Sequence, residues 1–216
     1  GFGLSEPSHS VYPCLTGTID SATGRGMTLT MQHEKKSWTL HSPLIGTHNA
    51  SNLLAAQALG LKLGMNCRDM RRLSDFTGAP GRLERVDNDK DLDIFVDYAH
   101  TPDALSNVMR SLRELDFEKL LVVFGCGGNR DVTKRPLMGR AVAEFADTAV
   151  VTSDNPRFET PAAIIDDILP GLKGCPDILV EANRRAAIRQ AVQRMRPGDC
   201  LLVAGKGHED YQEIEG

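Results

Sequence analysis

Four short polar segments carry most of the side chains in this chain that could do chemistry, and each directly follows an apolar run. They read DYAHTPD from Asp97, GCGGNRD from Gly125, SDNPRFE from Ser153 and GKGHED from Gly205. The segments combine guanidinium, carboxylate and imidazole groups with glycines, which let a ligand approach the backbone closely. Such a set suits the binding of a small charged molecule.

The DNPR run, formed by Asp154, Asn155, Pro156 and Arg157, is the most informative of these segments. An Asn-Pro pair after an apolar strand fixes a turn that can aim the flanking side chains outward. Arg157 could hold a carboxylate with two parallel N–H bonds, and Asp154 could accept from an ammonium group. Together they would suit an amino-acid-like zwitterion, although an ordinary solvated turn with a helix cap explains the same residues equally well.

The other segments leave similar alternatives open. Gly205 and Glu209 follow the last apolar run, but GKG is not a phosphate loop, because that motif needs a hydroxyl where Gly207 stands. Arg130 lies on a glycine turn that could equally be a tight connection. Asp97 could bind ribose hydroxyls or cap a turn, and a lone histidine such as His100 is more often a structural residue than a catalyst.

No motif indicates a covalent nucleophile or a metal cage. The sequence has no Ser/His/Asp triad motif, no H-E-x-x-H and no paired Cys/His spacing. The five cysteines are odd in number and widely separated, so most are expected to be reduced and buried: Cys14, Cys67, Cys126, Cys175 and Cys200.

The second part of the chain alternates apolar runs with amphipathic stretches, which predicts a doubly wound α/β sheet, mostly parallel. The runs are near-continuously hydrophobic, as strands covered on both faces should be. In such sheets ligands bind at the carboxyl ends of the strands, where the four polar segments lie. The expected strands are 93–97, 119–125, 147–153 and 199–205, and the expected helices are 102–115, 135–145, 161–171 and 183–195.

The first part of the chain has a different pattern. Short strands are expected within residues 15–41 as an antiparallel patch, followed by a helix from Asn49 and a second one over 67–76. The stretch TGAPGR, residues 77–82, is rich in glycine and proline, so a domain boundary is expected near residue 79.

Composition excludes several classes of protein. With 25 Lys and Arg against 29 Asp and Glu, the 216-residue chain lacks the basic excess that nucleic-acid binding needs. Its apolar runs are far shorter than the roughly 20 residues that span a bilayer, so no membrane insertion is expected. The chain starts Gly-Phe-Gly without a leader, which favours a cytoplasmic protein and indicates a piece of something longer.

Taken together and in order, six segments resemble the carboxyl-terminal part of a Mur ligase, most closely the MurE type that adds meso-diaminopimelate. The resemblance runs from about Gly46 to Gln212. Its segments are GTHNASN, GAPGRLE, DYAHTPDAL, FGCGGNRDVTKRPLMG, TSDNPRFE and AGKGHEDYQ.

This resemblance implies that residues 1–79 are the rear of a central ATP-binding domain. Residues 80–216 would then be a Rossmann-like domain for the incoming amino acid, truncated at its end. The family's phosphate loop and Mg²⁺ ligands would lie upstream of Gly1, so the chain alone should be inactive, with no catalytic or metal residue of its own. ATP and Mg²⁺ are the implied cofactors.

The resemblance also assigns site residues. Those on the ATP side would be Asn49, Asn52, Arg82, Asp97 and His100. Those for diaminopimelate would be Arg130, Asp154, Asn155, Pro156, Arg157, Gly205 and Glu209. Diaminopimelate has a second zwitterion at its far end, whereas lysine has no distal carboxylate, so Arg157 is the expected specificity residue.

The implied function is ATP-dependent amide ligation, which adds meso-diaminopimelate to UDP-N-acetylmuramoyl-L-alanyl-D-glutamate in peptidoglycan synthesis, and so serves cell-wall growth, cell shape and division. A monomer is expected. Two alternatives stay open. One is a Mur-like ligase for another amino acid, such as a lysine-adding or cyanophycin-type relative. The other is a non-catalytic nucleotide- or peptide-binding module, which a phosphate-loop motif encoded in frame ahead of Gly1 would exclude.

Overall fold

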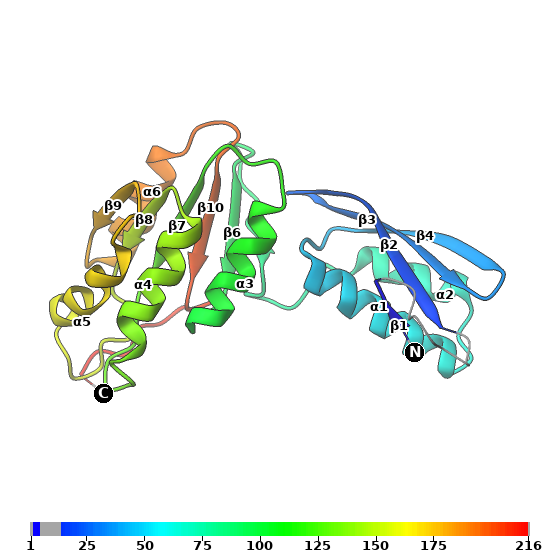
Figure 1. The fold of residues 1–216 in the computed structure, drawn as a ribbon, viewed down its shortest axis with the longest axis horizontal. Helices are drawn as coiled ribbons and strands as arrows, with labels where there is room; N and C mark the ends of the chain where they lie inside the picture. Colours follow the sequence, from blue (N-terminus) through cyan, green and yellow to red (C-terminus); the bar gives the residue numbers. More distant parts are fainter. Residues whose placement is uncertain (1, 5–13, 216) are drawn as a thin grey trace. The chain divides into compact units, whose positions relative to one another are not determined.

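The computed structural model describes residues 2–4 and 14–215, and the chain divides into two compact units, Gly1–Gly78 and Ala79–Gly216 (Figure 1). The division falls within the TGAPGR stretch. Each unit has its own sheet and its own buried core.

The first unit packs one face of a four-stranded sheet against a long helix. Its strands are β1 (Phe2–Gly3), β2 (Leu15–Thr23), β3 (Gly26–His33) and β4 (Lys36–Ser42), in the order β1-β2-β3-β4. The antiparallel patch expected here is present as β2, β3 and β4, whereas β1 pairs with β2 in parallel.

Alternation of side chains decides which face of this sheet is buried. Met27, Leu29 and Met31 of β3 point to the core, where they pack with Leu53 and Leu54 of the helix α1 (Thr47–Lys62). The second expected helix is broken into α2 (Cys67–Met70) and a 3-10 helix (Arg71–Asp75).

The second unit is built around a six-stranded sheet in the order β5-β6-β10-β7-β8-β9, with β5 antiparallel and the other strands parallel. The strands are β5 (Glu84–Arg85), β6 (Asp93–Asp97), β7 (Leu120–Phe124), β8 (Thr148–Val151), β9 (Asp177–Val180) and β10 (Cys200–Ala204). The expected doubly wound, mostly parallel sheet is therefore confirmed.

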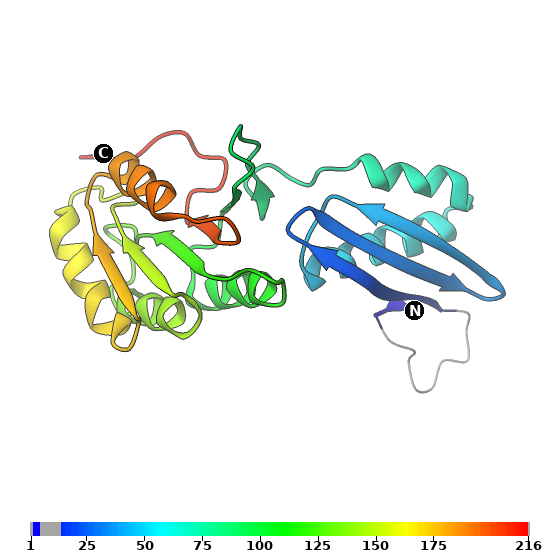
Figure 2. The same ribbon diagram turned by 90° about the horizontal axis from the view of Figure 1, so that it is seen from above.

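Helices cover both faces of this sheet, as Figure 2 shows. They are α3 (Pro102–Arg113), α4 (Lys134–Phe145), α5 (Pro161–Ile168), a 3-10 helix (Leu169–Leu172) and α6 (Arg184–Arg194). The chain moves in one direction from β6 to β9 and then reverses to insert β10. Because crossovers between parallel strands are right-handed, the reversal places α6 on the opposite face from α3, α4 and α5.

Every residue of β7 and of β10 is buried, which explains their continuous apolar sequences. Two strands of this sheet were not expected, nor was β1 of the first unit. β9 lies at the sheet edge, where three of its four residues are exposed, although Ile178, Leu179 and Val180 are apolar. β5 has only two residues.

The cysteine expectation is only half right. Cys126 and Cys200 are buried, but Cys14 and Cys175 are partly exposed, and the side chain of Cys67 lies outside the described residues. Cys126, Cys175 and Cys200 are free thiols. Within the described part of the chain, no helix is long and apolar enough to cross a membrane.

Candidate functional site

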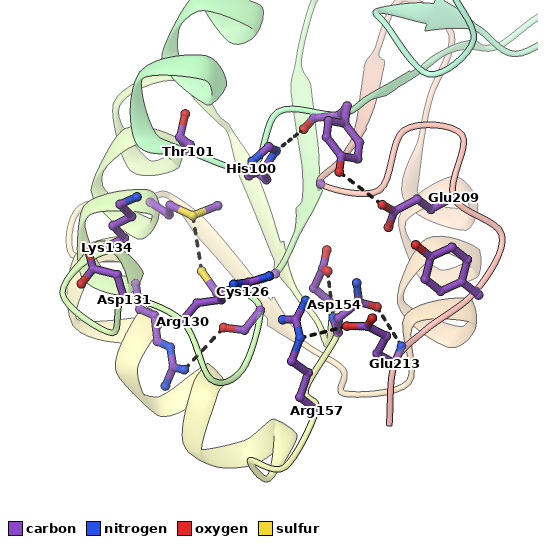
Figure 3. Close-up of a pocket in the computed structure, with 18 residues that line it drawn as sticks. His100, Thr101, Cys126, Arg130, Asp131, Lys134, Asp154, Arg157, Glu209 and Glu213 are labelled. Carbon is purple, nitrogen blue, oxygen red and sulfur yellow. Dashed lines mark hydrogen bonds and ion pairs between the residues drawn. The ribbon is translucent and has the colours of Figure 1, made fainter. Parts of the chain in front are cut away.

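A cavity of about 590 Å³ lies at the carboxyl edge of the six-stranded sheet (Figure 3). Its volume is within the range typical of small-molecule sites. The walls come from the segments that follow β6, β7, β8 and β10 and from the start of α4. Residues expected from the sequence that line it are His100, Arg130, Asp154, Asn155, Arg157, Gly205 and Glu209.

Arg157 is held in an unusual backbone conformation, with a φ angle of 53°. A non-glycine residue with positive φ is uncommon and stays there only where its surroundings fix it. Here its N–H donates to the Glu213 carbonyl oxygen at 3.1 Å and its own carbonyl oxygen accepts from Glu215 N at 2.8 Å. The turn therefore aims the Arg157 side chain into the cavity (Figure 3).

The Arg157 guanidinium has two partners of its own. Nη1 donates to the Gly128 carbonyl oxygen at 2.9 Å, and Nε lies 2.9 Å from Glu213 Oε2. The side chain keeps 22% of its surface exposed. Its guanidinium is thus oriented in advance while part of it stays accessible to a carboxylate in the cavity.

Glycines allow the loops after β7 and β8 to touch through their backbones. A Cβ on Gly125 would lie 2.2 Å from the Thr152 carbonyl oxygen, and one on Gly128 would lie 1.9 Å from that of Pro156. Pro156 does not line the cavity; its part is this backbone contact. The glycines of GCGGNRD therefore serve the packing of the DNPR turn.

Arg130 and Asp154 add one charge of each sign to the cavity wall. Arg130 is exposed, and Asp154 Oδ1 accepts from the Asn155 N–H at 2.8 Å. A Cβ on Gly205, whose φ is 108°, would lie 2.7 Å from Asp154 Oδ2. Any other residue at this position would therefore displace the Asp154 carboxylate.

Glu209 faces the cavity from the segment after β10. Its Oε1 accepts from the Tyr98 hydroxyl at 3.2 Å, and its Oε2 lies 3.1 Å from Lys206 Nζ. Burial raises the pKa of Glu209, but the Lys206 ammonium and the Tyr98 hydroxyl outweigh burial and hold the pKa below 4.5. The Glu209 carboxylate in turn raises the pKa of Tyr98, so the phenol stays protonated and donates.

Arg135, on α4, was not expected from the sequence. Its side chain is 2% exposed and bonds Glu159 Oε1 and Asp167 Oδ2, each at 2.8 Å. The hydrogen bond to Glu159 is the main reason that the pKa of Arg135 is raised and that the pKa of Glu159 is lowered. Since Glu159 also accepts from the Asn129 N–H, Arg135 ties the loop after β7 to the loop after β8.

A second cluster gathers around the Tyr98 ring. The Arg82 guanidinium lies 4.8 Å from the ring centroid, and the His100 ring packs edge-on at 4.9 Å. His100 Nδ1 lies 2.8 Å from the Tyr98 carbonyl oxygen, which can only accept, so Nδ1 carries the proton. Arg82 does not line the cavity, whereas His100 does.

The other residues expected on the ATP side are not among those that line the cavity. Asp97 is buried, and its oxygens accept from the Leu83 and Ala99 N–H groups, both at 2.7 Å. Asn49 and Asn52 lie on α1 in the first unit, where Asn49 Nδ2 donates to the Ile45 carbonyl oxygen at 2.9 Å. Within the described part of the chain, no group of three or more His, Cys, Asp or Glu side chains is placed to hold a metal ion.

Comparisons with known proteins identify the family of this chain. The family description "Mur ligase, glutamate ligase domain" matches residues 81–207. The diaminopimelate ligase of Lawsonia intracellularis, named UDP-N-acetylmuramoyl-L-alanyl-D-glutamate--2,6-diaminopimelate ligase, is 55% identical over 99% of this chain and 44% of its own length. The enzyme of the same name from Synechococcus elongatus is 45% identical over 97% of this chain and 44% of its own.

Solved structures give the same result. A structure titled as a UDP-N-acetylmuramoyl-L-alanyl-D-glutamate--2,6-diaminopimelate ligase superposes with a TM-score of 0.73 and 36% identity, and it covers 100% of this chain and 44% of its own. A Mycobacterium tuberculosis folylpolyglutamate synthase shares the fold, with a TM-score of 0.67 and 24% identity over 88% of this chain and 45% of its own. The chain thus spans less than half the length of these relatives, and it belongs to the Mur ligase family.

Proposed function

We propose that this chain provides the amino-acid-binding domain of an ATP-dependent ligase that adds meso-diaminopimelate to UDP-N-acetylmuramoyl-L-alanyl-D-glutamate in peptidoglycan synthesis. The observation that carries this proposal is that Arg157 and Glu209, from different loops, line one cavity of about 590 Å³. The names of relatives at 45% and 55% identity support the same substrate.

The far end of meso-diaminopimelate is a zwitterion, and the cavity offers complementary charges. Arg157 and Arg130 would bind its carboxylate, while Glu209 and Asp154 would accept from its ammonium. Asn155 and Gly205 line the same wall, and Pro156 shapes the turn. Lysine would leave the two guanidinium groups without a partner, which costs affinity.

The reaction we propose is amide formation through an acyl phosphate. The terminal carboxylate of the UDP-linked dipeptide takes the γ-phosphoryl group of ATP, and the amine of diaminopimelate then attacks the carbonyl carbon and expels phosphate. This domain would hold the amine in position for that attack.

Arg82, Asp97 and His100 would lie on the ATP side, and Asn49 and Asn52 would serve it from the first unit. Residues 1–79 would then belong to a central ATP-binding domain and 80–216 to the amino-acid domain. We assign no step to Mg²⁺ on the described residues. A cytoplasmic, monomeric enzyme that binds neither membranes nor nucleic acid completes the proposal.

Arg157→Ala in the full-length enzyme tests this assignment. Loss of one charged pairing should cost about 1.5 to 3 kcal/mol, or roughly ten- to hundredfold in affinity for meso-diaminopimelate, with little change for lysine. Calorimetry with both amino acids measures the effect. Arg189→Ala, which removes an exposed arginine from α6, is the matched control and should bind as the wild type does.

The runner-up is a Mur-like ligase for another amino acid, such as lysine. Equal affinity of the wild-type enzyme for lysine and meso-diaminopimelate, or unchanged selectivity after Arg157→Ala, would favour that function.

A further inference from the structure

Lys206 has no part in the binding scheme above, yet it is the most buried charged side chain of the GKGHED segment. Only 8% of the side chain is exposed, and Lys206 does not line the cavity that Arg157 and Glu209 share. A buried ammonium group is tolerated only where its N–H groups find partners. Its surroundings therefore indicate what it does.

The Lys206 ammonium group is surrounded by three partners. Nζ lies 2.9 Å from Asn155 Oδ1 and 3.1 Å from Glu209 Oε2, and it stands 5.2 Å from the centroid of the Tyr211 ring. The first two are hydrogen bonds to residues that line the cavity, and the third is a cation–π contact. Lys206 thus lies behind two cavity residues and touches both.

We propose that Lys206 is a positioning residue for amino-acid selectivity, which fixes the Asn155 amide and the Glu209 carboxylate in the orientations that they present to the ligand. The identity of the ligand rests on the proposed function. The orientation itself does not.

The Asn155 amide is fixed because its oxygen has two donors. Oδ1 accepts from Lys206 Nζ and from the Glu213 N–H, each at 2.9 Å. A flipped amide would turn its NH₂ group toward an ammonium and an N–H, which cannot accept. Asn155 therefore keeps Nδ2 as its remaining hydrogen-bonding group, a donor suited to a carboxylate.

The Glu209 carboxylate is fixed from two sides. Tyr98, which directly follows β6, donates to Oε1, and Lys206 donates to Oε2. An ionised carboxylate has about four acceptor positions, so capacity remains for an ammonium of the ligand. The donor, Asn155 Nδ2, and the acceptor, the Glu209 carboxylate, are thus held at a fixed separation. A zwitterion can bind to both groups, whereas a lone amine can bind only to the acceptor.

Four variants of the full-length enzyme test the proposal: Lys206→Met, Glu209→Gln, the double variant, and Lys119→Met as the matched control. Lys119 is exposed and precedes β7, at the opposite end of the sheet. Lys206→Met should raise KM for meso-diaminopimelate about tenfold, with kcat changed much less, while Lys119→Met should not change it. The KM of the double variant should be no higher than the higher of the two single-variant values, because Lys206 and Glu209 act in one hydrogen-bond network.

Additive effects of Lys206→Met and Glu209→Gln, or an unchanged KM in Lys206→Met, would overturn the proposal. Thermal unfolding shows whether Lys206→Met folds. If Lys206→Met does not fold, Lys206→Gln takes its place in the experiment. This variant keeps N–H donors without the charge, and its effect on KM should also be non-additive with that of Glu209→Gln.

A ligand-free measurement separates this proposal from the proposed function. Crystal structures of the wild type and Lys206→Met should differ in the orientation of the Asn155 amide and the Glu209 carboxylate, and unchanged orientations would overturn the positioning role. Wild-type enzyme that fails to bind meso-diaminopimelate would contradict the proposed function instead.

Discussion

The two walls of the cavity are held in place in different ways. The Arg157 wall is fixed mainly by the backbone: its turn pairs with residues 213–215 and packs against Gly128 without room for a Cβ. The Glu209 wall is fixed by side chains, through the hydrogen bonds of Tyr98 and Lys206. The first wall should therefore be sensitive to added atoms, and the second to lost polar groups.

The largest effect is expected from Gly128→Ala. The new Cβ would lie 1.9 Å from the Pro156 carbonyl oxygen, so the loops after β7 and β8 must separate. We expect the free energy of unfolding to fall by about 3 kcal/mol, as in severe overpacking, together with the loss of meso-diaminopimelate binding. Urea denaturation gives the first quantity and calorimetry the second.

Gly127→Ala is the control for this change. A Cβ at Gly127 would come closest to the end of the flexible Arg157 side chain, at 3.1 Å, and would lie at ordinary contact distance from Arg130 Cγ and the Asn155 carbonyl oxygen, so stability should change by less than about 1 kcal/mol. Equal losses of stability in the two variants would show that the backbone contact does not set this wall.

Tyr98→Phe tests the side-chain wall and should have a smaller effect. The ring remains beneath the Arg82 guanidinium, but the hydrogen bond to Glu209 is lost. Affinity for meso-diaminopimelate should fall about three- to tenfold, which is the net value of one such bond. Tyr211→Phe removes the hydroxyl of another tyrosine that lines the cavity but keeps its ring near Lys206, so it should lower the calorimetric affinity less; a similar loss in both would contradict the role of the Tyr98 hydroxyl.

The smallest effect concerns pH. Burial raises the pKa of Glu209, but Lys206, Tyr98 and His208 together hold it below 4.5. The carboxylate therefore stays ionised as the pH falls from neutral, and its contributions to binding and stability are lost only in acid, as the pH falls through its lowered pKa. Calorimetry at stepped pH should show affinity constant above pH 5, and in Lys206→Met the acid limit should move to higher pH. A decline that begins near neutral pH in the wild type would point to another group.

The sequence predicted the parts of the fold that are strongly patterned. The continuous apolar runs that became β6, β7, β8 and β10 were identifiable because both faces of those strands are covered. The edge strand β9 was missed, since DILV is short and mostly exposed. The break between α2 and the 3-10 helix after Met70 left no signal in the helical pattern.

For the site, the sequence indicated the loops better than the contacts within them. DNPR and GKGHED carry the cavity residues Arg157 and Glu209, but nothing in either segment shows that Lys206 bonds Asn155, 51 residues away. Arg135 was missed because a buried arginine on a helix has no local signature, and Glu213 was missed because it lies outside the polar segments. Such partners depend on the order of the strands, which local patterns do not specify.

The place of β10 in the sheet has a consequence for the synthesis of the protein. β10 lies between β6 and β7 and pairs with both, so Cys200 pairs with Asp93 and with Leu120, two residues made much earlier in the chain. Until residues up to Ala204 have emerged from the ribosome, β10 cannot pair between β6 and β7. During that time the edges of these two strands that β10 will cover are open to pairing with other chains. Pairing of residues so distant in sequence is slow, so the nascent chain has to wait with these edges unpaired, and chaperones that bind apolar strands would act in that interval.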